Sequence, residues 1–171
     1  EFWATSKRAG TAFGNEAWVR EDVAKLRPRV DVLLVAFHWG KEKHDTPEPY
    51  QKTLAHAAVE AGADAVIGHH PHVLQGLEVY RGKPIIYSLG NFAGFKNFAL
   101  GGTLSLSGIF RVVLRPDGSW ESARLIPVLL HGAGLPALDS SDASVRLVAQ
   151  LSREDFGANA AHFATNGTLE E

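Results

Sequence analysis

The sequence has 171 residues, of which 45% are hydrophobic and 21% charged, and its formal net charge is −2. This balance is that of an ordinary globular domain, and the 17 scattered Lys and Arg residues argue against nucleic acid as the main partner. The absence of cysteine excludes disulfides and thiolate metal sites, and no apolar run approaches the roughly 20 residues that would span a bilayer.

The first predicted elements are a helix and a strand. Apolar residues recur at helical spacing over residues 15–26, and Pro28 ends the pattern. The run Val32–Phe37 is continuous, apolar and rich in strand-forming residues, which is typical of a strand buried on both faces. We therefore expect a central strand of a parallel sheet there.

A second helix and strand complete a crossover with that strand. The helix is predicted over residues 47–61, with Asp45 or Thr46 as its cap and Gly62 at its end. The short apolar run 65–67 follows directly. A strand, helix and strand in this order are expected to place the two strands parallel, with a right-handed connection.

The rest of the chain is predicted to be rich in hairpins. The expected elements are strands 77–80 and 84–88, a loop at 93–102, strands 109–114 and 120–126, a loop at 131–136 and a helix at 140–155. We expect residues 1–156 to belong to one domain and residues 157–171 to form a loosely ordered tail.

Four of the eight histidines follow the two predicted parallel strands. His38 follows the first, and His69, His70 and His72 follow the second. Because ligands gather beyond the carboxyl ends of strands in an open α/β sheet, these imidazoles are expected to converge. Imidazole is the commonest metal ligand in proteins, so the cluster predicts a metal site. For any single histidine, a hydrogen bond in the core is the simpler interpretation.

Three neighbouring residues are candidates for contact with a substrate. Trp39 adds an apolar surface next to His38, and Asn91 follows another strand end that could reach the same edge. Glu42 lies in the loop after His38, where it could contact substrate or support the ligands. A solvated loop explains Glu42 equally well.

Three motifs together resemble a known family. The segments Phe37–Glu42, Gly68–Gly76 and Tyr87–Phe92 are similar, in order and spacing, to the later motifs of the CapA family of poly-γ-glutamate synthesis proteins. This family belongs with the calcineurin-like metallophosphatases. The segment Phe2–Ala4 resembles the residues after the family's central strand. The resemblance implies an α/β fold, namely the carboxyl-terminal half of a metallophosphatase sandwich, with a parallel crossover unit, β-hairpins and flanking helices.

The resemblance also implies roles for the histidines. His38 would match the family's isolated metal histidine, and His70 and His72 its closing His-x-His pair. Since His69 stands where the wider pattern has glycine, either registration of the pair remains open. His69 is alternatively a general acid or a donor to phosphate.

The acidic motifs that precede these histidines in calcineurin-like enzymes have no match before Val30. Two cations about 3.5–4 Å apart need anionic bridging ligands, which neutral imidazoles cannot replace. Glu1 also makes an unnatural start, since the sequence lacks an initial Met. We therefore expect a missing N-terminal half, on another chain or lost, to complete the site. A tag remnant before a complete small domain is the alternative.

The resemblance implies a two-metal hydrolase or transferase that uses Mn, Fe or Zn and takes an anionic polymer or phosphoester as substrate. Its expected setting is poly-γ-glutamate synthesis, anchoring or export at the bacterial cell envelope or extracellular face. The alternative is a non-catalytic binding or assembly module for an anionic polymer or a partner protein.

Overall fold

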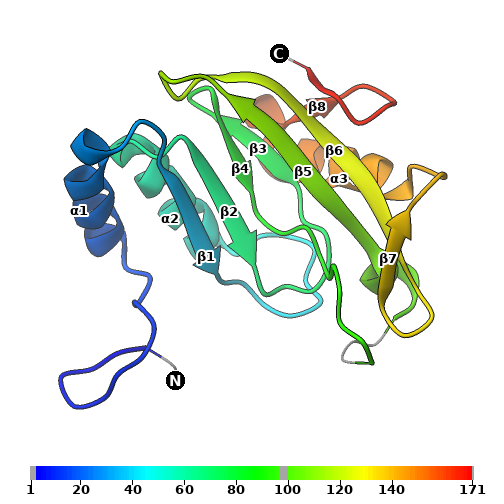
Figure 1. The fold of residues 1–171 in the computed structure, drawn as a ribbon, viewed down its shortest axis with the longest axis horizontal. Coiled ribbons are helices and arrows are strands. Elements are labelled where there is room, and N and C mark those ends of the chain that lie inside the picture. The colour runs from blue at the N-terminus through cyan, green and yellow to red at the C-terminus, as the bar shows by residue number, and fades with distance from the viewer. Residues whose placement is uncertain (1–2, 97–99, 171) are drawn as a thin grey trace.

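A computed structural model describes residues 3–96 and 100–170 (Figure 1). Glu1, Phe2 and residues 97–99 of the expected loop lie outside the described residues. The helices are α1 (Glu16–Leu26), η1 (Arg27–Arg29), α2 (Pro49–Ala61), η2 (Gly102–Ser105), α3 (Ala143–Phe156) and η3 (Gly157–Asn159). The strands are β1 (Leu34–His38), β2 (Ala65–His69), β3 (Leu77–Tyr80), β4 (Lys83–Ile86), β5 (Leu106–Leu114), β6 (Trp120–His131), β7 (Leu135–Leu138), β8 (His162–Phe163) and β9 (Leu169–Glu170).

The first sheet has the strand order β1-β2-β4-β3. β1 and β2 are parallel neighbours, as the crossover argument predicted, and β4 adds to β2 in parallel. β3 and β4 form the expected antiparallel hairpin. The mixed α/β architecture with a parallel sheet and flanking helices is therefore confirmed.

The second helix begins later than predicted. Glu48 is the cap of α2, its side chain accepting a bond from the Gln51 amide while the Gln51 side chain accepts one from the Glu48 amide. This capping box, with Pro49 in the first turn, replaces the expected cap at Asp45 or Thr46. Gly62 ends the helix at φ 117°, a left-handed conformation that favours glycine.

Two apolar clusters cover opposite faces of the first sheet. Val66 and Ile85 belong to the cluster that packs against α1 and α2. Their neighbours Ile67 and Ile86 pack in the cluster built with α3 and the β5–β6 hairpin. Because successive strand residues face opposite ways, β2 and β4 are central in both layers. Figure 1 shows β5 and β6 lying across the sheet from α1 and α2.

β1 differs from the predicted strand buried on both faces. Val35 and Phe37 pack against the first cluster, but Leu34 on the other face is 50% exposed. Among the described residues no strand pairs with the free edge of β1. An apolar groove of about 1450 Å³ runs along this strand and reaches His38. β1 is therefore an edge strand of the described sheet, despite its apolar sequence.

The second sheet, β5-β6-β7, extends beyond the predicted hairpin. β5 begins at Leu106 and β6 continues to His131, and a tight turn brings Leu135–Leu138 back against β6. The sequence suggested a loop at 131–136. The turn uses positive φ at Gly132 and Gly134, so the glycines serve a hairpin instead of a long loop.

The carboxyl-terminal segment is also more ordered than expected. β8 and β9 pair antiparallel, and Ala160, Ala161 and Leu169 are buried in the second cluster or beside it. The Ala161 amide donates to the Leu77 carbonyl on β3 at 3.1 Å. Apolar anchors of this kind hold a terminal segment that its composition alone would leave free.

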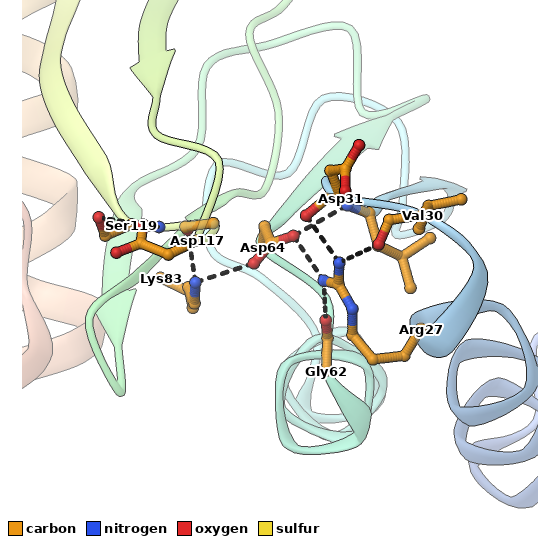
Figure 2. A network of polar contacts seen from close by, with 10 residues as sticks. Arg27, Val30, Asp31, Gly62, Asp64, Lys83, Asp117 and Ser119 are labelled. Atoms are coloured by element: carbon orange, nitrogen blue, oxygen red, sulfur yellow. Dashed lines mark hydrogen bonds and ion pairs between the residues drawn. The ribbon is translucent and has the colours of Figure 1, made fainter.

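A buried charged cluster holds the amino ends of the first strands (Figure 2). The Asp64 carboxylate accepts bonds from Arg27 at 2.7 Å, from Lys83 at 2.9 Å and from the Leu33 amide at 2.9 Å. Burial by itself would raise the pKa of this carboxyl, but these bonds outweigh it and hold the pKa below its usual value. Lys83 also donates to the Gly118 carbonyl in the β5–β6 turn, so the cluster joins the two sheets.

No described helix is long and apolar enough to cross a membrane.

Candidate metal site

The histidines lie together at the carboxyl ends of β1 and β2. His38 and His69 are partners in the parallel register, and the Trp39 amide donates to the His69 carbonyl at 3.0 Å just beyond it. The rings of His38 and His70 have centroids 4.6 Å apart, and those of His70 and His72 are 6.0 Å apart. His38 therefore lies beside His70, and His70 beside His72.

An unusual backbone sets this arrangement. His70 has φ 103° and His72 has φ 61°, a region that residues with a side chain rarely adopt. Pro71 between them is buried, and its carbonyl accepts a bond from the Lys43 amide at 2.7 Å. Such conformations cost free energy and cluster at functional sites, where the surrounding structure enforces them.

Asn91 orients His72 and does not line an open surface. Its side chain is 3% exposed, and its Oδ1 lies 2.7 Å from His72 Nδ1. The Asn91 amide nitrogen donates to the carbonyls of His72 and Leu104. Because the amide nitrogen is committed to these acceptors, Oδ1 must accept from the ring, which places the His72 proton on Nδ1 and the lone pair on Nε2. We expected Asn91 to bind substrate, and its burial is the reason for this correction.

Glu42 joins the imidazoles. Glu42, His70 and His72 each offer one ligand atom, and the three atoms lie within 4.8 Å of one another. Two imidazoles and one carboxylate are a donor set that suits Zn, Fe or Mn. The residues present therefore fit a divalent cation, and the structure places Glu42 with possible ligands.

Buried amides hold the Glu42 loop against the histidine loop. Gln51 and Gln75 are both fully buried, and the Gln51 amide nitrogen lies 3.3 Å from Gln75 Oε1. Gln75 in turn donates to the His44 carbonyl at 2.9 Å. Sequence reasoning missed both glutamines. The available signal was Gln51 itself, a polar residue on the apolar stripe of α2 just before Leu54.

Trp39 packs in the core instead of facing a substrate. It is 4% exposed, its indole nitrogen donates to the Tyr87 carbonyl at 3.0 Å, and its ring stacks on Phe37. A Cβ at Gly68 would lie 2.3 Å from that indole nitrogen. The expected substrate contact is corrected because Trp39 and His38, adjacent in the chain, face opposite sides.

The remaining histidine, His69, has an exposed side chain outside the group of possible ligands found among the described residues. Burial, and then the neighbouring His38, lower the pKa of His70, although Glu42 acts in the opposite direction. A lowered pKa favours the neutral imidazole that binds metal. The geometry thus favours His70 and His72 as the pair, with His38 and His69 on the exposed side.

The amino-terminal half of the chain is similar in sequence to bacterial capsule synthesis proteins. Residues 1–95 match the family model described as bacterial capsule synthesis protein PGA_cap. The chain is 42% identical over 93 residues to the capsule biosynthesis protein CapA of Bacillus anthracis, which is 52% of this chain and 23% of the relative. It is 47% identical over 70 residues to the PGA biosynthesis protein CapA of Bacillus subtilis, or 41% of this chain and 18% of the relative.

A third relative comes from Mycobacterium tuberculosis and bears the name "probable polyglutamine synthesis accessory protein". It is 39% identical over 69 residues, covering 40% of this chain and 18% of the relative. The chain therefore matches less than a quarter of the length of each of these three proteins.

Proposed function

Because the chain belongs to the bacterial capsule synthesis family PGA_cap, we propose that the protein acts in capsule synthesis as a metal-dependent hydrolase or transferase on poly-γ-glutamate. The named relatives support the pathway, since two are capsule or PGA biosynthesis proteins and a third is a polyglutamine synthesis accessory protein. A role in capsule synthesis would take the protein to the bacterial cell envelope. The polymer is anionic, which suits a site that holds cations.

The observation that carries this proposal is the convergence of His38, His70 and His72 at one strand edge, with Glu42 beside them. His70 and His72 would hold a divalent cation, and Asn91 would keep the His72 ring in the ligating tautomer. Mn, Fe or Zn bound there would supply Lewis-acid chemistry, polarising an oxygen of the substrate. Exposed His38 and His69 lie where an imidazole could hold or move a proton at the substrate.

A two-metal site would need further carboxylates. Cations about 3.5–4 Å apart repel each other, and bridging anions offset this repulsion. We infer that a preceding half of the domain supplies them and adds a strand to β1. The free edge of β1 and the apolar groove beside it support this partner, because an apolar edge strand is otherwise prone to association.

A binding or assembly module is the second candidate. It is favoured by the exposure of His38, His69 and Glu42, which leaves the site open on the described surface. In this alternative the cation would hold carboxylates of the polymer, or of a partner protein, without breaking a bond.

The test uses the longer protein that contains this chain, loaded in turn with Mn, Fe and Zn. Metal content is measured by mass spectrometry, the hydrolysis of bis-p-nitrophenyl phosphate by absorbance, and the chain length of added poly-γ-glutamate by size-exclusion chromatography. We expect metal-dependent turnover of at least one substrate, lost in His38→Ala and kept in the control His162→Ala, whose exposed histidine lies on β8. Metal uptake and polymer binding without turnover would support the binding module instead.

A further inference from the structure

We infer that Glu42 is a metal ligand, so that this chain by itself holds one divalent cation through Glu42, His70 and His72. The inference rests on the proposed function and deepens it. It adds one anionic ligand from this chain, the Glu42 carboxylate, to a site whose other ligands are imidazoles. The sequence suggested Glu42 as a substrate contact or a supporting residue, and the geometry points to direct coordination.

The distances allow a shared ion. Ligands bound to one cation at about 2.0–2.2 Å lie at most about 4.4 Å from one another. The candidate atoms of Glu42, His70 and His72 lie within 4.8 Å of one another. Glu42 is exposed, so a small rotation of its side chain brings the carboxylate into range without disturbing the core.

The partners of the nearby carboxylates favour Glu42 as the ligand. Glu48, in the same loop, is committed to the cap of α2 and to an ion pair with Lys41 at 3.0 Å. Among the described residues, Glu42 forms neither a helix cap nor an ion pair with Lys or Arg, and its ligand oxygen lies within 4.8 Å of a ring nitrogen each of His70 and His72. A carboxylate facing imidazoles is the charge that a bound cation needs.

The backbone holds both halves of this site before an ion binds. The residue after Glu42 is fixed by the bond from the Lys43 amide to the Pro71 carbonyl. Pro71 separates the two histidines whose φ values are positive, so one hydrogen bond ties the carboxylate loop to the imidazole loop. Strain retained next to a prepared set of ligands indicates a site arranged for binding.

The donor set limits the kind of cation. Two imidazole nitrogens and one carboxylate, without thiolate, suit Zn, Fe(II) or Mn(II), whereas Ca prefers six to eight oxygens. Three protein ligands leave coordination positions open. An oxyanion, such as a carboxylate of the polymer or a phosphate, could occupy these positions.

The experiment is a titration of the 171-residue chain with Zn, followed by calorimetry, and with Co(II), followed by its visible absorption. The expected result is one ion per chain, with affinity lowered at least about tenfold in Glu42→Gln, because losing a ligand should cost at least as much as losing a residue that orients one. Glu121→Gln, an exposed carboxylate on β6, is the matched control and should bind as the unchanged chain does. Thermal melts of the metal-free variants confirm that both fold.

Equal affinity in Glu42→Gln and the unchanged chain, or no metal binding by the chain at all, would overturn the inference. Glu42-dependent binding together with a longer protein that turns over no substrate would support this inference while the proposed hydrolase fails. Turnover that survives Glu42→Gln with an unchanged metal requirement would support the proposed hydrolase and overturn the role of Glu42 as a ligand.

Discussion

The two ends of the β1–β2 pair use their ionisable side chains in opposite ways. At the amino end, Asp64 is 3% exposed and both of its carboxylate oxygens accept bonds, from Arg27, Lys83 and the Leu33 amide (Figure 2). At the carboxyl end, imidazoles and a carboxylate face one another, and His70 has a strained backbone. The same two strands support both arrangements.

The difference separates a structural cluster from a binding site. Charges that are paired inside the protein stabilise the fold and leave nothing for a ligand to satisfy. Donors that face each other, on a backbone that costs free energy, persist when the surrounding fold enforces them for another purpose. Changes at the amino end should therefore affect stability, and changes at the carboxyl end should affect metal affinity.

The largest effect is expected from Asp64→Ala. Removing this carboxylate leaves Arg27 and Lys83 without their buried partner, and we expect a loss of about 3 kcal/mol in the free energy of unfolding. This value is at the low end of the usual range because both cations are partly exposed. Urea denaturation measures it. Zinc affinity should stay unchanged, and a loss below about 1 kcal/mol would contradict the structural role of Asp64.

The second change, Asn91→Ala, should act at the carboxyl ends of β1 and β2, where it should lower metal affinity. Without Oδ1 to accept the Nδ1 proton, the His72 ring samples both tautomers, so zinc affinity should fall by about 10–100-fold. Nitrogen NMR of the imidazole reports the tautomer directly. Asn159→Ala, which removes an amide that donates to Glu78 at 3.1 Å, is the control and should leave zinc affinity intact. A single His72 tautomer, with the proton on Nδ1, in Asn91→Ala would contradict the role of Asn91 in positioning the ring.

The third prediction concerns acid. Since the pKa of Asp64 is lower in the folded protein than in the unfolded chain, its stabilisation is fully present above the unfolded pKa of about 3.9 and is lost as pH falls through the folded pKa. Arg27 and Lys83 bind this carboxyl, and Asp117 lies in the adjoining β5–β6 turn, where bonds from the Ser119 hydroxyl and amide lower the pKa of Asp117. Denaturation below about pH 4 should show a weaker pH dependence in Asp64→Asn than in the unchanged chain. The same pH dependence of the free energy of unfolding in both proteins below about pH 4 would contradict the prediction.

The smallest effect is a gain. His70→Gly removes a side chain from a backbone at φ 103°, and the relief of strain should outweigh the extra entropy of the unfolded chain by about 1 kcal/mol. The metal-free variant should therefore be slightly more stable, while zinc binding is lost. His69→Gly, one residue earlier and at the end of β2, provides the matched comparison and should be slightly less stable. Reversed signs for the two variants would refute the assignment of strain to His70.

The crossover and the hairpins were predictable because they depend on local patterns. Continuous apolar runs marked β1 and β2, and turn residues marked the β3–β4 and β5–β6 hairpins. The position of β1 in the sheet was not predictable, because an apolar strand looks the same whether or not a neighbour is present. Residues 131–136 were read as a loop, because the pairing of β7 with β6 depends on contacts that a local pattern does not carry.

The site was predictable in its location and less so in its parts. Strand alternation would pair His38 with His69, its register partner, whereas the positive φ at His70 turns the next ring toward His38. No local sequence pattern predicts this positive φ at His70. Alternation could have revealed that Trp39 faces away from His38, but the burial of Asn91 depends on its packing against η2, whose Leu104 carbonyl accepts a bond from the Asn91 amide.

The most direct test of a cation site at the carboxyl ends of β1 and β2 is a crystal structure of the chain grown with Zn, with diffraction recorded at the zinc absorption edge. We predict a single anomalous peak per chain within about 2.0–2.2 Å of a Glu42 oxygen and of one ring nitrogen each of His70 and His72. A peak bound elsewhere, or a fully occupied ion that Glu42 does not contact, would contradict it.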